Sequence, residues 1–297
     1  MSMKLSSQRV GIKNIGCRRI SETGFLTSNY LLLTLIGIVL LFPYFYMVTR
    51  SLMSYDQLRE QIPGFIPKPL DLNGWKDAFI TGGYVQSTLR TMAIVSFNIV
   101  AAPLSASLVA FGFARTKFAG SRILFSMMLG TMMLPGVVTQ IPLYTIFNNF
   151  GWLNTILPLT IPNLFGGGAI FIFLIRQFMR GIPKELDRAA YIDGANIFQI
   201  YWKIILPLCA PVLIFVVISV FNANWGDFYG PLMYMRKAGN ETLAYRLFLE
   251  ATSTNVGTTK ENIRMAAGTF MSIFPLILFF IFQKQLIEGV STTGLKG

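Results

Sequence analysis

Six apolar runs of membrane-spanning length constrain the fold of this chain more than any other feature. A helix needs about 20 apolar residues to cross a bilayer, and within lipid it satisfies its own backbone polar groups. Charged residues make up 13% of the chain, about half the share of ~25% in soluble domains. The sequence therefore predicts an all-α membrane protein with six transmembrane helices. The expected spans are residues 30–48, 91–113, 123–147, 153–175, 204–228 and 265–282.

The distribution of basic residues predicts which loops face the cytoplasm. The two tails, the 114–122 loop and the 183–203 stretch with its flanks carry 15 Lys or Arg and five Asp or Glu, whereas the opposite loops carry 10 and eight. Because cytoplasmic loops are enriched in Lys and Arg, we expect both termini and the 183–203 stretch on the cytoplasmic side. The alternative, an odd number of spans, would place that stretch and one tail on opposite sides.

The spans also define the organisation of the chain. The expected parts are a basic cytoplasmic tail at 1–28, a six-helix domain at 29–282 and a cytoplasmic tail at 283–297. The 30–48 run is too long for a signal-peptide core and has no small-x-small cleavage site, so it should remain as the first span. Two long outer connections lie at 51–85 and 231–262. Prolines and a Gly-Gly-Gly run at 166–168 interrupt the middle spans.

The residue types that catalysis and metal binding require are scarce. The chain has no histidine, which removes the commonest proton shuttle and metal ligand. Its two cysteines, Cys17 and Cys209, support neither a disulfide framework nor a metal site. A phosphate-binding Gly-x-x-x-x-Gly-Lys-Ser/Thr loop is absent from the sequence. We therefore expect no metal site, no catalytic residues and no nucleotide site on this chain, and any ATP hydrolysis must come from another polypeptide.

The net charge of +12 requires a separate explanation. A strongly basic protein is a candidate for nucleic-acid binding, but most of this charge lies in the loops assigned to the cytoplasm. It therefore reports membrane topology, and we expect no nucleic-acid partner.

The 183–203 stretch is the longest polar, helix-competent segment between two apolar runs. Pro183 suits the first turn of a helix, and Gly194 suits the left-handed position after its end, so residues 183–193 should form a short helix. Asn196 can cap a second helical piece, which ends near Pro207. On the first helix we expect one face formed by Leu186, Ala189 and Ala190, and an opposite face formed by Lys184, Asp187, Arg188 and Tyr191.

This stretch resembles the EAA signature of bacterial ABC importer permeases. The matching elements are Ala189-Ala190, Asp193-Gly194-Ala195 and Ile204-x-Leu206-Pro207. The resemblance implies a cytoplasmic coupling helix that docks on a separate ATPase subunit. Arg188 stands where the family has an acidic residue, so either Glu185 or Asp187 could supply the acidic contact. The residues implied in ATPase coupling are Glu185, Asp187, Arg188, Ala189, Ala190, Asp193, Gly194 and Ala195.

Two further segments resemble carbohydrate permeases. Residues 222–232 are similar to the family element Trp-Asn-Asp-Phe-x-x-Pro-Leu, with Gly226 in place of Asn. The C-terminal tail resembles that of the smaller permease of maltose-type importers, which reaches between the ATPase subunits. This implies ATPase contacts by Glu288, Gly289 and Lys296. By the same resemblance, the 51–85 loop should contain a short lateral helix, and the 231–262 loop should probe the cleft of a binding protein. A plain solvated loop is the alternative for the latter.

Polar side chains within spans are costly and are therefore candidates for the substrate path. Aromatic rings, amides and a carboxylate are also what the apolar faces and hydroxyl groups of a sugar require. The aromatic residues of this set would equally suit the membrane interface, and Asp227 could serve only as a structural cap. The candidates are Gln140, Tyr144, Asn163, Asn222, Asn224, Trp225 and Asp227.

The resemblance covers residues 28–297 and implies the smaller permease of a type I ABC importer in a bacterial cytoplasmic membrane. Its implied partners are a second permease, an ATPase dimer that carries ATP and Mg²⁺, and a periplasmic solute-binding protein. A permease for a non-sugar solute is one alternative. A secondary transporter is another, although the spans carry almost none of the midplane charges that ion coupling requires. An intramembrane enzyme would need paired catalytic residues, which the sequence does not show.

Overall fold

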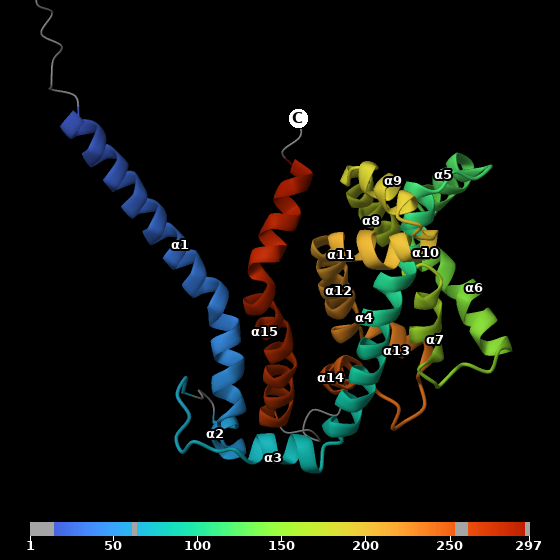
Figure 1. Cartoon of the computed structure of the whole chain (residues 1–297). Coiled ribbons are helices and arrows are strands. Elements are labelled where there is room, and N and C mark those ends of the chain that lie inside the picture. The colour runs from blue at the N-terminus through green and yellow to red at the C-terminus, as the bar shows by residue number, and fades with distance from the viewer. Residues whose placement is uncertain (1–14, 61–63, 253–260, 295–297) are drawn as a thin grey trace, which may run out of the picture.

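The computed structural model describes residues 15–60, 64–252 and 261–294, and for residues 15–25 and 284–294 only the backbone. Within these ranges the chain is helical and has no strand, apart from a single bridge between Met53 and Leu70. Three long helices dominate the shape, α1 (Ile15–Ser51), α4 (Tyr84–Arg115) and α15 (Glu261–Gly294). α1 packs against α15 in its C-terminal half and diverges from the bundle toward its N-terminus (Figure 1).

The spans are partly as predicted. Four segments are long and apolar enough to cross a membrane, Leu26–Ser51, Tyr84–Arg115, Leu157–Gly181 and Glu261–Gln283. Two bent helix pairs bring the number to six if each pair is one span. The exposed side chains of these segments are largely apolar, as on α1, where no residue between Leu26 and Val48 is buried. Such a surface suits lipid, because lipid hydrocarbon needs no polar partner.

The expected third and fifth spans are not continuous helices. α5 (Ser121–Thr131) and α6 (Gly136–Asn149) meet at 100°, and the segment Ile197–Leu208 meets α12 (Ala210–Trp225) at 76°. Pro135 lies directly before α6 in the first break, and Pro211 directly follows the second. A proline lacks the N–H of the helical ladder and clashes with the preceding turn, so each apolar run bends where a proline interrupts it.

The expected fourth span is interrupted by the glycine run. α7 (Leu157–Thr160) and the 3₁₀ turn η1 (Ile161–Leu164) lead into three glycines at 166–168, all with positive φ, before α8 (Ala169–Gly181) begins. At Gly167 an added Cβ would lie 2.7 Å from the carbonyl oxygen of Ala102 on α4. Glycine is required here both by the backbone conformation and by the close approach of α4.

Short helices lie at the ends of the long ones, within the two connections 51–85 and 231–262. α2 (Tyr55–Leu58) and α3 (Asn73–Ile80) follow α1, and α3 lies across the ends of α1 and α15 (Figure 1). This confirms a lateral helix within 51–85. α13 (Tyr229–Tyr234) and α14 (Leu243–Thr252) fall largely within the 231–262 connection. The backbone N–H of Leu243 donates to Thr91 Oγ1 on α4 at 2.9 Å, so the alternative of a plain solvated loop is wrong for α14.

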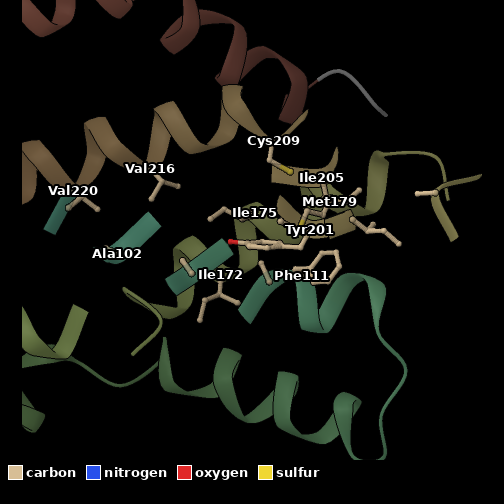
Figure 2. Close-up of a cluster of buried hydrophobic side chains, with 14 residues drawn as sticks. Ala102, Phe111, Ile172, Ile175, Met179, Tyr201, Ile205, Cys209, Val216 and Val220 are labelled. Atoms are coloured by element: carbon tan, nitrogen blue, oxygen red, sulfur yellow. The ribbon is translucent and has the colours of Figure 1, made fainter. Parts of the chain in front are cut away.

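The largest core cluster among the described residues joins α4 and α8 to the segment Ile197–Leu208 and to α12. Figure 2 shows the Tyr201 ring beside Phe111, with Met179 and Ile205 nearby. Three alanines on α4, Ala102, Ala106 and Ala110, are fully buried in this cluster. Small residues allow membrane helices to approach closely. The packing therefore connects the long helix α4 directly to the polar stretch that the sequence singled out.

Candidate functional site

The 183–203 stretch forms a helix, a glycine corner and a second helical piece. α9 (Glu185–Ile192) begins after Lys184, so Pro183 precedes the helix and does not lie in its first turn as predicted. Gly194 has φ +81°, which confirms the left-handed corner. There the Ala195 N–H donates to the Ala190 carbonyl at 2.9 Å, a hydrogen bond that satisfies the helix end.

The second piece is capped as predicted. The Asn196 side chain accepts from the Gln199 N–H at 2.9 Å, and the Gln199 side chain accepts from the Asn196 N–H at 2.8 Å. This reciprocal pair is a capping box. It starts α10 (Ile197–Gln199), which continues through the π-helical turn η2 (Ile200–Ile205) and α11 (Leu206–Leu208).

The expected faces of α9 are wrong. Ala190 is buried, but Leu186 and Ala189 are exposed. Asp187, which was expected on the face opposite Ala190, instead lies 3.0 Å from Arg115 Nη1 at the end of α4. Residues three apart share a helix face, so Asp187 and Ala190 form the inner face together. The basic partner, which lies in another helix, decided the rotation of α9.

The outer surface of this stretch is apolar with a charged rim. Ile192 is 86% exposed, and Tyr191, Phe198 and Trp202 are also exposed. Several of the expected coupling residues lie on the same exposed surface: Glu185, Arg188, Ala189, Asp193 and Gly194, whereas Ala195 is half-buried. Exposed apolar side chains rimmed by polar ones are typical of surfaces that bind another protein. We call the exposed side of residues 185–202 the docking surface.

Buried contacts hold this surface against the bundle. The Tyr201 hydroxyl lies 2.8 Å from Ser107 Oγ on α4, and its ring centroid lies 5.2 Å from that of Phe111. In Figure 1, α9 and α10 lie at the end of the molecule opposite α2 and α3, on the same side as the N-terminal end of α1 and the C-terminal end of α15.

Two of the substrate-path candidates serve the packing of helices in this structure. Trp225 is only 2% exposed, and its indole N–H donates to the Met271 carbonyl on α15 at 2.8 Å. Asn224 Oδ1 accepts a hydrogen bond of 2.6 Å from Asn98 on α4. Both polar groups are therefore satisfied between helices, and a place on the substrate path stays a prediction for Trp225 and Asn224. The neighbouring Asn222 is exposed.

Other candidates gather around α13. The Tyr229 hydroxyl donates to Gln140 Oε1 on α6 at 2.6 Å, and the ring of Tyr144 stacks on Tyr234 with centroids 6.4 Å apart. Asp227 Oδ1 accepts from the backbone N–H of Tyr229 and Gly230, each at 2.9 Å, so it caps the start of α13. Tyr229 and Tyr234 were not among the candidates predicted from the sequence, although Tyr229 lies within the 222–232 element.

The remaining candidates are only partly placed. Asn163 in η1 is half-buried and donates to the Leu159 carbonyl at 3.4 Å. The expected tail contacts Glu288, Gly289 and Lys296 lie outside the residues whose side chains are described. In the described part of the chain, no three His, Cys, Asp or Glu side chains are grouped to hold a metal ion.

Known proteins resemble this chain over most of its length. A transport system permease from Thermoanaerobacterium thermosulfurigenes, named for starch degradation products (AmyC), is 30% identical over 270 residues, which are 89% of this chain and 96% of that protein. The melibiose/raffinose/stachyose import permease MelC of Bacillus subtilis is 25% identical over 94% of this chain and all of its own length.

The fold has a solved counterpart. A chain in the crystal structure of a bacterial ABC transporter that imports the acidic polysaccharide alginate superposes with a TM-score of 0.78, over 95% of this chain and 99% of that one. The two sequences are 20% identical, so the likeness establishes the fold of a type I importer permease. In addition, residues 104–292 match the family described as binding-protein-dependent transport system inner membrane component. With the apolar segments of membrane-spanning length and the relatives above, this match shows that the chain belongs to that family of inner-membrane permeases.

Proposed function

We propose that this chain pairs with a second permease to form the path of a carbohydrate importer, and that α9 couples it to a separate ATPase dimer. A periplasmic binding protein would deliver the solute to the outer helices. ATP and Mg²⁺ would bind the ATPase, whose closure shifts the permeases between their two openings. The docking surface supports this proposal most directly, because it combines exposed apolar side chains with buried attachments to α4.

The geometry favours one of the two candidates, Glu185 and Asp187, for the acidic contact to the ATPase. Asp187 is paired with Arg115 within this chain, whereas Glu185 is exposed on the docking surface. A carboxylate engaged in a buried pair is a poor partner for a second cation, because leaving its first partner would strand a buried charge. We infer that Glu185, and not Asp187, supplies the acidic contact to the ATPase.

The carbohydrate class rests on the relatives. The curated relatives named above are permeases for starch degradation products and for melibiose, raffinose and stachyose. We propose an oligosaccharide as the solute of this chain. Uptake of radiolabelled malto-oligosaccharide and raffinose by vesicles containing the assembled transporter and its binding protein tests this. Uptake of neither sugar, together with uptake of a non-sugar solute, would contradict it.

Assembly with an ATPase tests the coupling role. We expect Ile192→Ser combined with Phe198→Ser to abolish co-purification of the ATPase, because both side chains are exposed on the docking surface. Ile80→Ser is the matched control, since Ile80 is an exposed isoleucine on α3 at the opposite end of the bundle. Full ATPase recovery with the double variant, or transport that survives ATP depletion, would refute the proposal.

A further inference from the structure

One buried arginine connects three helices at the base of α9. Arg115 lies in the last turn of α4. Its Nη2 donates to the carbonyls of Met179 and Ile182 at 2.8 and 2.9 Å, and its Nη1 donates to Asp187 Oδ2 at 3.0 Å. The guanidinium therefore contacts the end of α8, the link that follows it and the first turn of α9 at once.

The contacts of the Arg115 guanidinium are of a kind that holds the neighbouring helices in one arrangement. The last carbonyls of a helix have no partner within the helix, and they attract positive charge, so the end of α8 is a good acceptor for Arg115. The planar guanidinium presents its donors in a rigid fork. A lysine at this position could not hold two carbonyls and a carboxylate in the same arrangement.

Burial makes the pair sensitive to the loss of either member. The side chain of Arg115 is 4% exposed and that of Asp187 is 16% exposed. Arg115 Nε and Asp187 Oδ1 are buried without a hydrogen-bond partner. A buried pair with such gaps recovers its desolvation cost incompletely. We therefore explain the Arg115–Asp187 pair by the position that it imposes on α9, and not by a contribution to the stability of the fold.

The rest of the inner face of α9 offers little to set its position. Ala190 is the one buried side chain of α9, and an alanine methyl group is too small to fix rotation or tilt by packing. Among the described residues, the Arg115–Asp187 pair is also the only ion pair that reaches α9. Within the docking surface, α9 is thus held to α4 mainly through this guanidinium, whereas η2 is held to α4 through Tyr201.

We propose that Arg115 is a positioning residue for coupling: it locks α9 to α4 and α8, so that displacement of the docking surface moves the transmembrane bundle. This inference rests on the proposed contact of α9 with the ATPase. If the pair breaks, α9 remains a helix but moves relative to α4, and ATP hydrolysis no longer drives transport efficiently. A purely stabilising role predicts instead that activity follows the stability of the fold.

A pair of variants separates these two roles. Arg115→Gln leaves Asp187 buried without a cation, and adding Asp187→Asn removes that unpaired charge. We therefore expect the double variant to recover most of the thermal stability lost in the single variant, but not the position of α9. Arg180→Gln is the control, because Arg180 is an exposed arginine in the last turn of α8.

The position of α9 can be measured without any ATPase. Spin labels at Ile192 on α9 and Val100 on α4, both exposed, report the distance between the helices in the full chain in nanodiscs, with Cys17 and Cys209 replaced. We expect a narrow distribution in the parent chain and in Arg180→Gln. Both Arg115 variants should lower the population of the parent distance by about tenfold or more. An unchanged distribution in the double variant would overturn the proposal.

Coupling is then measured on the assembled transporter in vesicles, as solute imported per ATP hydrolysed. We expect this ratio to fall about tenfold in the single and double Arg115 variants alike and to stay at the parent value in Arg180→Gln. Recovery of the ratio together with stability in the double variant would overturn the positioning role. If α9 moves as expected but no ATPase assembles with any form of the chain, the proposed function fails while the positioning of α9 by Arg115 stands.

Discussion

Replacement of Gly194 is the most direct test of the glycine corner. The residue has φ +81°, and an added Cβ would meet no atom within 4 Å. A residue placed here therefore meets no steric clash at its Cβ. Its effect on coupling would come from backbone strain alone. The left-handed conformation costs an ordinary L-residue about 1–2 kcal/mol, while asparagine adopts it more readily. We expect the effect to increase in the order Gly194→Asn, Gly194→Ala, Gly194→Val.

The strain should open the corner and leave the bundle folded. Two backbone hydrogen bonds close the corner, from Ala195 to Ala190 at 2.9 Å and from Gly194 to Tyr191 at 3.1 Å. Each contributes about 1 kcal/mol net, so a strain of about 1–2 kcal/mol is comparable with what holds the corner. The buried cluster around Tyr201 joins several helices through many side chains. It should therefore persist when these two hydrogen bonds break. The docking surface would then lose its shape without global unfolding.

The assay is transport and ATP hydrolysis in the same reconstituted vesicles, together with the thermal unfolding midpoint. We expect Gly194→Val to reduce solute imported per ATP several-fold with a small change in midpoint, and Gly194→Asn to remain close to the parent. Gly181→Val is the matched control, because Gly181 lies at the end of α8 with open space around it and no positive φ. Parental coupling in Gly194→Val would refute the requirement for a left-handed corner.

Three further changes follow from the same structure. Arg188→Glu should preserve ATPase co-purification, because Arg188 is exposed and the change places an acidic residue before Ala189; strong loss of assembly would count against this. Gly167→Ala should destabilise the chain by about 2–4 kcal/mol, because its Cβ would lie 2.7 Å from the Ala102 oxygen at φ +60°; thermal unfolding measures the cost. Asn98→Ala should cost about 1–3 kcal/mol by the same measurement, because the buried Asn98 amide donates to the Leu159 carbonyl and to Asn224 Oδ1, and its loss removes both hydrogen bonds between helices; an unchanged midpoint would contradict that role.

Local features of the chain could be predicted because their causes lie within a few residues. The left-handed conformation of Gly194 follows from the absence of a Cβ, and the capping box at Asn196 involves residues three apart. Apolar runs of membrane length likewise identify spans from composition alone. These rules correctly predicted the short helix, the left-handed corner and the capped second piece of the 183–203 stretch. The role of this stretch in ATPase coupling stays a prediction.

The sequence by itself therefore determined the helical membrane class and the helix, glycine corner and second helical piece between α8 and α12. The tertiary structure decided which way the side chains point. Asp187 faces inward because Arg115, 72 positions away, ends α4 beside it. Trp225 is buried because a carbonyl of α15 accepts its indole N–H. Helical periodicity and capping report only near neighbours in the chain, whereas a buried charge or ring is oriented by whichever distant helix supplies its partner.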